Sequence, residues 1–348
     1  MTKYIGYVGT YTKEESKGVY RFTLDTEKEE LTDVSLAAEL TNPTYVTVSN
    51  DNKNLYAVAK EEENGGVTAF SISDQKGELT RLNSYTSAGS PPCHVSVSSD
   101  KRHVVSANYH TTKVESYLTN EDGSLNPAED VVIHEGSGPH ERQEKPHMHF
   151  AGFTPDEKYV IAIDLGSDKI TTYAIENGKL TKAQEYTPKA GSGPRHITFH
   201  PNGKYAYVMT ELSSEVIFLH YNEQDGTFSE QQYISTIPED FNDTNDGSAI
   251  HISSDGKFIY AGNRGHNSIA VFSVDQRNGQ LSFIEWTSTE GNWPRDFELA
   301  PSENYLVASN QKSNTLTLFK RDKDSGRLQL IQAGVNVPEP VCVKFLHE

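Results

Sequence analysis

Short runs in which apolar and polar residues alternate fill most of the chain, and turn-forming residues separate them. In the stretch from Gly191 to Leu212, ITF and YAYVM alternate, and HPNGK between them supplies the turn residues. The pattern predicts two strands joined by a tight turn. A shift of 100 residues brings Pro194-Arg195 onto Pro294-Arg295 and Tyr205 onto Tyr305. Recurrence at a fixed distance indicates a repeat architecture.

Six copies of the turn and the second strand are recognisable, and their starts lie 46 to 56 residues apart. A third strand follows each copy, and a fourth strand comes next with a glycine at its start, which suits a hairpin turn that needs a positive φ. The six copies are NDNKNLYAV (Asn50 to Val58), SDKRHVVSA (Ser99 to Ala107), PDEKYVIAI (Pro155 to Ile163), PNGKYAYVM (Pro201 to Met209), SDGKFIYAG (Ser254 to Gly262) and PSENYLVAS (Pro301 to Ser309).

The two ends of the chain supply a seventh unit. Near the N-terminus, YIGYVGTY, KGVYRFTLD and EELTDVSL match strands two, three and four, while PVCVKFL near the C-terminus matches strand one. The repeat therefore predicts an all-β fold: a seven-bladed β-propeller with four antiparallel strands per blade, closed by both terminal strands, with residues 1–348 as a single domain. Such closure removes free sheet edges. Two β-sandwiches, the alternative, would not give seven in-phase copies of four strands.

The composition of the chain limits the classes of partner that it is expected to bind. A formal net charge of −18 argues against nucleic acid, although a small anionic ligand responds to local charge. No apolar run reaches the roughly 18 residues of a membrane-spanning helix, so no membrane partner is expected. Two cysteines, Cys93 and Cys342, form no disulfide framework, and MTKYIGYVGTYT lacks a signal-peptide core. We therefore expect a cytoplasmic protein; its oligomeric state is left open.

Two rings of side chains are predicted at one mouth of the channel. The start of strand one and the end of strand two lie on the same face of a propeller, and here these positions diverge into charged types while the strand bodies stay alike. Such divergence is typical of a functional site carried by a fold. The first ring is Thr44, Cys93, His149, Arg195, Ser248, Arg295 and Val341. The second ring is Tyr11, Lys60, Tyr109, Leu165, Glu211, Arg264 and Gln311.

The arginines carry most of the functional prediction. A single Arg195 could be a turn residue paired with an acid, but Arg295 at the matching position and Arg264 on the same mouth favour an anion site, because guanidinium groups bind phosphate or carboxylate bidentately. Glu211 is either a structural partner of an arginine or a general base, which needs a raised pKa. Candidate catalytic residues are Glu211, His149 and Arg195, and candidate substrate-binding residues are Arg264, Arg295, Lys60, His196, Tyr11 and Gln311.

The remaining candidate motifs give weaker indications of chemical function. His147 and His149 are two apart on a predicted strand and should point the same way, but no third ligand follows at a recognisable spacing, so neither a metal site nor any other cofactor is expected. Cys93 is predicted to be a free thiol, and Ser248 lacks a nucleophile-elbow context. Two long connections on the same face, His134 to Lys145 and Pro238 to Gly247, are predicted to form walls or lids.

The chain resembles the seven-bladed propeller lactonase family, whose bacterial members are 6-phosphogluconolactonases. The resemblance covers nearly the whole chain and rests on VGTYT, GSGPRHITFHPNGKYAYVMTEL, NRGHNSIAVF, PRDF and ASNQKSNTLTLF. The family includes fungal enzymes that close carboxymuconate to a lactone, in which a His, two Arg and a Glu are implicated. By position in the motifs, these are similar to His149, Arg195, Arg264 and Glu211.

The resemblance implies a metal-free hydrolase that converts 6-phospho-D-glucono-1,5-lactone to 6-phosphogluconate in the pentose phosphate pathway of carbohydrate metabolism. In that interpretation Arg195 stabilises the carbonyl oxygen, Glu211 or His149 takes the proton from water, and Arg264, Arg295 and Lys60 are candidates for the phosphate; the two arginine roles could be exchanged. The alternatives are a muconate-type lactonizing isomerase and a non-catalytic propeller that binds a sugar acid or a protein partner.

Overall fold

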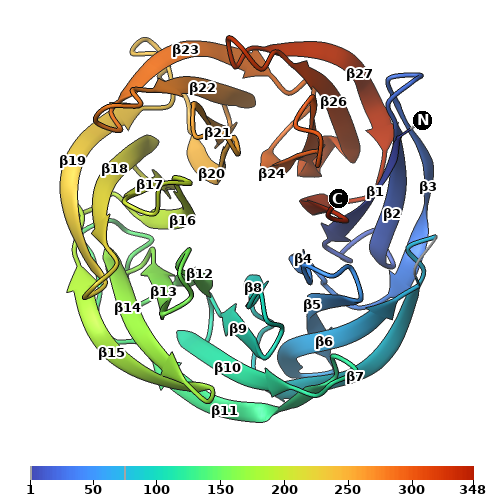
Figure 1. Ribbon diagram of the computed structural model, residues 1–348, viewed down its shortest axis with the longest axis vertical. Helices are drawn as coiled ribbons and strands as arrows, with labels where there is room; N and C mark the ends of the chain where they lie inside the picture. Colours follow the sequence, from blue (N-terminus) through green and yellow to red (C-terminus); the bar gives the residue numbers. More distant parts are fainter. Residues whose placement is uncertain (1, 74–75) are drawn as a thin grey trace.

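A ring of seven sheets surrounds a central channel in the computed structural model, which describes residues 2–73 and 76–348 (Figure 1). Every sheet contains four antiparallel strands, and among these residues the only helix is the short 3-10 helix η1 (Gln311–Ser313). The predicted seven-bladed β-propeller is confirmed. Within the described ranges, no helix has the length and apolarity needed to cross a bilayer.

The first and second strands of each blade lie nearest the channel (Figure 1). The first strands are β4 (Val46–Val48), β8 (His94–Val97), β12 (Met148–Phe153), β16 (Pro194–Phe199), β20 (Asp246–Ile252), β24 (Pro294–Leu299) and β28 (Pro340–Phe345). The second strands are β5 (Asn54–Glu61), β9 (His103–Ala107), β13 (Tyr159–Asp164), β17 (Tyr205–Thr210), β21 (Phe258–Arg264), β25 (Tyr305–Asn310) and β1 (Lys3–Thr10).

The third and fourth strands build the outer part of the ring. The third strands are β6 (Asn64–Ile72), β10 (Lys113–Thr119), β14 (Lys169–Glu176), β18 (Glu215–Asn222), β22 (Ser268–Val274), β26 (Thr315–Arg321) and β2 (Gly18–Asp25). The fourth strands are β7 (Leu79–Ala88), β11 (Leu125–Ile133), β15 (Lys179–Tyr186), β19 (Thr227–Ser235), β23 (Leu281–Ser288), β27 (Leu328–Asn336) and β3 (Glu30–Glu39).

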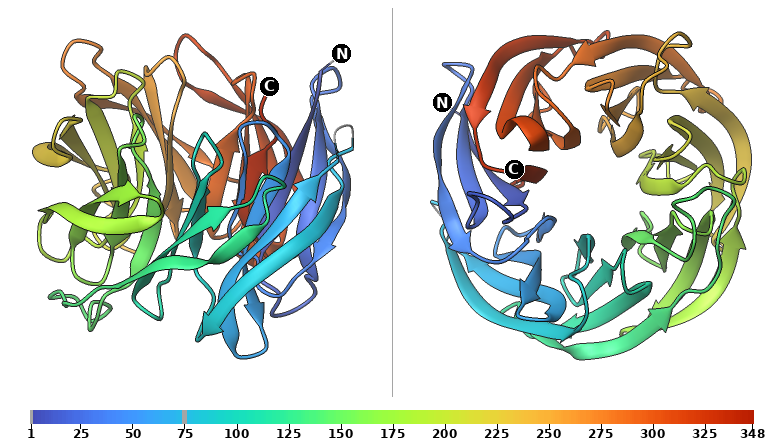
Figure 2. Two further views of the ribbon diagram at one scale, coloured as in Figure 1. Left: turned by 60° about the horizontal axis from the view of Figure 1, so that its bottom comes forward. Right: turned by 180° about the vertical axis from the view of Figure 1, so that it is seen from behind.

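The last blade combines both ends of the chain, as the sequence predicts. Its strand order is β28-β1-β2-β3, and the antiparallel register pairs Val8 with Val343. Figure 2 shows the N-terminal and C-terminal segments at this same blade from two further directions. Because β1 pairs with β28, its edge is not left open to other chains.

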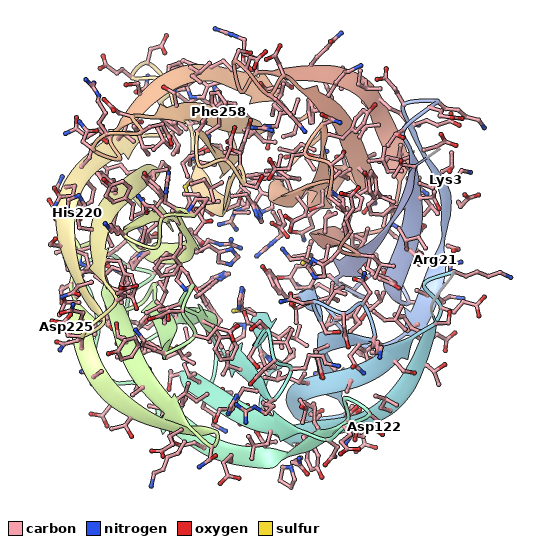
Figure 3. The ribbon with its side chains drawn as sticks, viewed as in Figure 1. Lys3, Arg21, Asp122, His220, Asp225 and Phe258 are labelled. Atoms are coloured by element: carbon pink, nitrogen blue, oxygen red, sulfur yellow. The ribbon has the colours of Figure 1, made fainter. Side chains whose placement is uncertain are left out.

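The hydrophobic core lies between neighbouring blades rather than within one sheet. Tyr207 and Met209 of β17 pack against Ile259 and Phe272 of the next blade, and all four side chains are buried. The second strand β17 is therefore buried on both faces along almost its whole length, whereas the fourth strand β19 has only partly buried and exposed residues. In Figure 3, charged side chains project from the outer rim of the ring.

A hydrogen bond that recurs between blades ends on the glycine that precedes several of the fourth strands. Gly279 has a φ of 79° and Gly326 a φ of 75°, a region that favours glycine. At four interfaces between neighbouring blades, a tyrosine hydroxyl of one blade donates to the carbonyl of the hairpin glycine in the following blade. These pairs are Tyr7 with Gly77 (2.8 Å), Tyr56 with Gly123 (2.9 Å), Tyr207 with Gly279 (2.8 Å) and Tyr260 with Gly326 (2.8 Å).

The substitution Tyr207→Phe tests this contact. It leaves the Gly279 carbonyl without its buried donor, and we expect a loss of about 1–3 kcal/mol in the free energy of unfolding. Thermal unfolding followed by circular dichroism measures the effect. Tyr159→Phe is the matched control, because the Tyr159 hydroxyl donates to the Gln224 carbonyl at the exposed surface. Equal losses in both variants would contradict the interpretation.

Candidate active site

β-Bulges place the first ring of side chains. In β16, Pro194 pairs with Thr210 and His196 pairs with Met209, so Arg195 is an extra residue that has no partner on β17. A bulge breaks the alternation of a strand and re-aims the side chain at that position. The same two-against-one pairing isolates His149 in β12, Arg295 in β24 and Val341 in β28.

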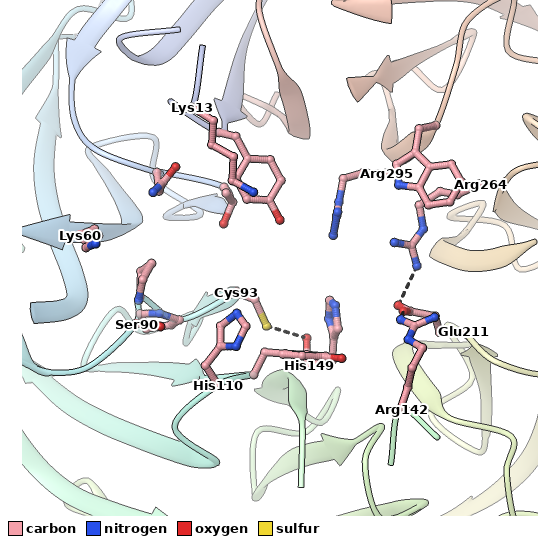
Figure 4. A pocket seen from close by; sticks show the side chains of 17 residues that line it. Lys13, Lys60, Ser90, Cys93, His110, Arg142, His149, Glu211, Arg264 and Arg295 are labelled. Carbon is pink, nitrogen blue, oxygen red and sulfur yellow. Dashed lines mark hydrogen bonds and ion pairs between the residues drawn. The ribbon is translucent and has the colours of Figure 1, made fainter. Parts of the chain in front are cut away.

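One mouth of the channel forms a pocket of about 480 Å³, a volume suited to a small molecule (Figure 4). Its lining includes five cationic side chains and one carboxylate, although the whole chain carries −18. The local charge therefore favours an anionic ligand. The charged lining residues are Lys13, Lys60, Arg142, Glu211, Arg264 and Arg295.

Most of the predicted ring positions meet at this pocket. From the first ring, Thr44, Cys93, His149 and Arg295 line it; from the second, Tyr11, Lys60, Tyr109, Glu211 and Arg264 do. Arg195 lines a narrow cavity of about 30 Å³, which shares several of these lining residues. Leu165 is fully buried and belongs to the core.

Three guanidinium groups converge on the carboxylate of Glu211, and Figure 4 shows two of them, those of Arg142 and Arg264. Oε2 of Glu211 accepts a hydrogen bond from Nε of Arg195 at 3.0 Å and pairs with Nη2 of Arg264 at 2.6 Å. The other oxygen, Oε1, accepts from Nη2 of Arg142, whose Nη1 donates to Asp246 at 2.9 Å. Glu211, Arg195 and Arg264 are each at most 4 % exposed, so these charges interact with little screening.

The charges around Glu211 decide its ionisation. Burial by itself would raise the pKa of Glu211, but the positive charges of Arg264 and Arg195 lower it far below the ordinary value. The carboxylate therefore stays ionised at neutral pH. A general base needs the opposite shift, so the structure favours the alternative interpretation, in which Glu211 is the partner of the arginines.

His149, in the wall of the same pocket, is held in its uncharged form. Burial lowers the pKa of His149 well below its ordinary value, and the charge of Arg195 adds to this effect. The imidazole is therefore neutral at neutral pH. Its Nδ1 is buried and has no hydrogen-bond partner, and the ring lines the pocket. A neutral imidazole at this position can accept a proton from a water molecule.

Arg142 is a site residue that the sequence analysis missed. It lies in the connection between β11 and β12, which was predicted to form a wall of the site. Gln143, which is fully buried, fixes this connection: its Nε2 donates to the Leu165 carbonyl at 2.8 Å, and its Oε1 accepts from the His140 amide at 3.1 Å. Nothing in the polar run HERQEK indicates that its arginine, rather than another of its charged residues, would contact Glu211. The second long connection contributes Asp246 but no residue that lines the pocket.

Two predicted substrate-binding residues lie behind the pocket lining. The ring of His196 lies 5.2 Å from that of His149, and its Nε2 is 3.4 Å from Nη1 of Arg195. Gln311 accepts a hydrogen bond from Nη1 of Arg295 at 3.4 Å. Neither residue lines the 480 Å³ pocket, so their contacts support the orientation of His149, Arg195 and Arg295.

His147 precedes β12, which begins at Met148, and His149 is the bulge residue of that strand, yet both rings lie against Tyr109, with the His149 centroid 5.9 Å from the tyrosine ring. The His147 ring stacks on Tyr109 at 4.1 Å, and its Nδ1 lies 3.0 Å from the Tyr109 carbonyl. Across residues 2–73 and 76–348, no group of three or more His, Cys, Asp or Glu side chains is arranged to hold a metal ion. Cys93 is a free thiol as predicted, and burial raises its pKa to about 12.

Comparisons with known proteins agree with this fold. The family model described as lactonase, 7-bladed beta-propeller, matches residues 5–345, and the chain belongs to this family. It is 56 % identical over 348 residues, the whole of both chains, to the 6-phosphogluconolactonase of Bacillus subtilis strain 168.

Solved structures are similar over almost the whole chain. A protein from Lactobacillus plantarum is 42 % identical with a TM-score of 0.96, and the match covers 99 % of this chain and 100 % of that one. A periplasmic gluconolactonase from Pseudomonas aeruginosa is 31 % identical with a TM-score of 0.94, covering 99 % of both chains. The predicted family resemblance is therefore confirmed.

Glu211→Gln tests the role of the buried carboxylate. The substitution leaves three guanidinium groups without their shared counter-charge, and we expect a loss of about 3–5 kcal/mol in stability at neutral pH. Because the pKa of Glu211 is lower in the folded than in the unfolded chain, its contribution is present above the unfolded value and fades as the pH falls below it. The difference in melting temperature between wild type and variant should therefore shrink between pH ~6 and pH ~3.

The control for this prediction is Glu223→Gln, which removes an exposed carboxylate from the same blade. It should change the melting temperature little at any pH. A constant gap between wild type and Glu211→Gln across the acid range would argue that Glu211 is not held ionised by the arginines.

Proposed function

We propose that this protein is a 6-phosphogluconolactonase, which hydrolyses 6-phospho-D-glucono-1,5-lactone to 6-phosphogluconate in the pentose phosphate pathway. The observation that carries the proposal is the cationic pocket with a neutral histidine in its wall. The 56 % identity to a curated 6-phosphogluconolactonase over the full chain supports the same substrate. The two free cysteines suit a cytoplasmic setting.

His149 is the proposed general base. Water attacks the lactone carbonyl carbon while His149 takes one of its protons, and the carbonyl oxygen gains negative charge. When the tetrahedral intermediate collapses, the bond to the ring oxygen breaks, and the protonated His149 returns the proton to that oxygen as the open-chain alcohol forms. An anionic group beside the imidazole favours its protonated form, so the bound substrate helps the ring to hold the proton in transit.

Arg264 is the better candidate for the developing oxyanion. Its side chain lines the pocket, and its buried Nε has no hydrogen-bond partner within the protein, so the donors of this guanidinium are not all used by protein groups. Arg195 already uses its Nε on Glu211 and lines only the narrow cavity. Of the two assignments that the sequence left open, these contacts favour Arg264 at the oxyanion and Arg195 as its support.

Glu211 then acts as an electrostatic organiser. Its ionised carboxylate keeps the guanidinium groups of Arg195 and Arg264 in place before the substrate arrives. Donors that are fixed in advance need no reorganisation as charge develops, and such preorganisation commonly lowers a barrier by a few kcal/mol.

The first test follows the loss of the δ-lactone at neutral pH by the purified protein, with spontaneous hydrolysis subtracted. Wild type should exceed the blank, and His149→Gln should lower kcat by roughly 10²–10⁴-fold because water loses its proton acceptor. His220→Gln, on an exposed outer position, is the matched control and should behave as wild type. A wild-type rate equal to the blank would refute the proposed function, while turnover of a carboxymuconate in its place would assign the isomerase.

A second test separates the two arginines. Arg264→Ala removes the donor that faces the pocket, and kcat should fall by roughly 10²–10³-fold, the usual cost of one oxyanion donor. KM should change much less, since the charge develops in the transition state. If Arg264→Ala raised KM and left kcat intact, Arg264 would instead be a ground-state contact.

A further inference from the structure

The cations of the pocket fall into two groups that differ in their partners. Arg142, Arg195 and Arg264 share Glu211, and Arg142 also pairs with Asp246. Lys13, Lys60 and Arg295 are different: among residues 2–73 and 76–348, no carboxylate oxygen lies within 4.0 Å of any of their charged groups. The Nε of Arg295 is moreover buried without any hydrogen-bond partner. Positive charge that is not neutralised by the protein therefore collects at Lys13 and Arg295.

An aromatic ring holds these two cations together. The Tyr11 ring centroid lies 4.4 Å from Nζ of Lys13 and 5.4 Å from Cζ of Arg295, within the range of cation–π contacts. Figure 4 shows Arg295 between Lys13 and Arg264, with Glu211 and Arg142 below Arg264. The arrangement brings together adjacent blades, because Tyr11 follows β1 and Arg295 is the bulge residue of β24.

Contacts from both neighbouring segments fix the backbone that carries Lys13. The buried carboxylate of Glu339 accepts hydrogen bonds from the amides of Lys13 at 3.1 Å and of Glu14 at 2.9 Å. On the other side, Oδ1 of Asn42 accepts from the amide of Thr12 at 3.0 Å. These hydrogen bonds fix the position of the segment that follows β1. The Glu339 carboxylate binds backbone amides and not the Lys13 ammonium.

We propose that Lys13 and Arg295, on either side of Tyr11, form a separate subsite for the phosphate monoester of the substrate. The inference rests on the proposed function and deepens it: the lactone ring is recognised at His149 and Arg264, and the phosphate at the Lys13 end. Lys60, which lines the same pocket, adds to the positive field there. Arg264, a candidate for the phosphate on sequence grounds, is assigned to the lactone.

The local charge indicates which end of the pocket binds the phosphate and which binds the oxyanion. A phosphate monoester carries close to two negative charges at neutral pH, and a nearby carboxylate repels it. At the other end, Glu211 and Asp246 offset much of the charge of their three arginines, which suits the single charge of an oxyanion. The guanidinium of Arg295 offers a planar fork of donors and the ammonium of Lys13 a compact charge, and phosphate accepts both.

The experiment compares two substrates, 6-phosphogluconolactone and the unphosphorylated glucono-1,5-lactone, on wild type, Lys13→Ala and Lys13→Arg. Lys13→Ala should lower kcat/KM for the phosphorylated lactone relative to the unphosphorylated one by roughly 10–100-fold, the usual effect of losing one charged hydrogen bond. The loss should appear in KM, and Lys13→Arg should restore most of it. Lys17→Ala is the matched control, because Lys17 is exposed on the same segment and does not line the pocket.

A second measurement does not depend on turnover. Inorganic phosphate should raise the melting temperature of wild type and of Lys17→Ala above that in chloride of equal ionic strength, and should do so much less for Lys13→Ala. A discrimination ratio that is unchanged in Lys13→Ala, or equal stabilisation of all variants by phosphate, would overturn the subsite. If wild type hydrolysed neither lactone, the proposed function would fail, while the phosphate measurement would still decide the subsite.

Discussion

Closure of the ring is the constraint on which the rest of this structure depends. The pairing of β28 with β1 joins the two ends of the chain in one sheet, so seven blades must share the space around one axis. Each first strand then faces the channel, and the start of every first strand meets the end of every second strand at the same mouth. Residues as distant as Tyr11 and Arg295 become neighbours through this geometry. The hydroxyl contacts to the hairpin glycines fix the spacing of the blades around the ring.

Within that frame, one buried carboxylate organises the chemistry. Glu211 holds Arg195, Arg264 and Arg142, and in return their charges keep it ionised. Two of these cations help to keep His149 neutral, because Arg195 and Arg264 add to the effect of burial on its pKa. The site thus separates two tasks: an ionised group positions the positive charge, and an uncharged group is free to accept a proton. Burial is what makes both effects strong, since water screens little of the charge there.

Much of this architecture can be predicted from the chain alone. The blade boundaries, the glycines of the hairpins and the shared last blade follow from alternation and turn chemistry, which are local properties. The ring positions of His149, Arg195, Arg264 and Arg295 follow from the repeat. The role of Glu211 does not, because its ionisation depends on guanidinium groups from three other segments. Arg142 could not be singled out either, since its reach depends on how Gln143 anchors an irregular loop. Gln311 belongs to the second predicted ring and His196 directly follows Arg195 in the chain, but neither side chain lines the pocket.

The sequence by itself determined the fold class, the number of blades and the set of positions from which the site is drawn, because the period of a strand and the demands of a turn are written in adjacent residues. Tertiary structure alone decided which of those side chains reach the pocket and in what charge state. The bulges at His149, Arg195 and Arg295 illustrate the difference, since an extra residue is defined only by its pairing with a second strand. The ionisation of Glu211 and the unpaired charges of Lys13 and Arg295 depend likewise on distances between blades, to which no local pattern in the chain refers.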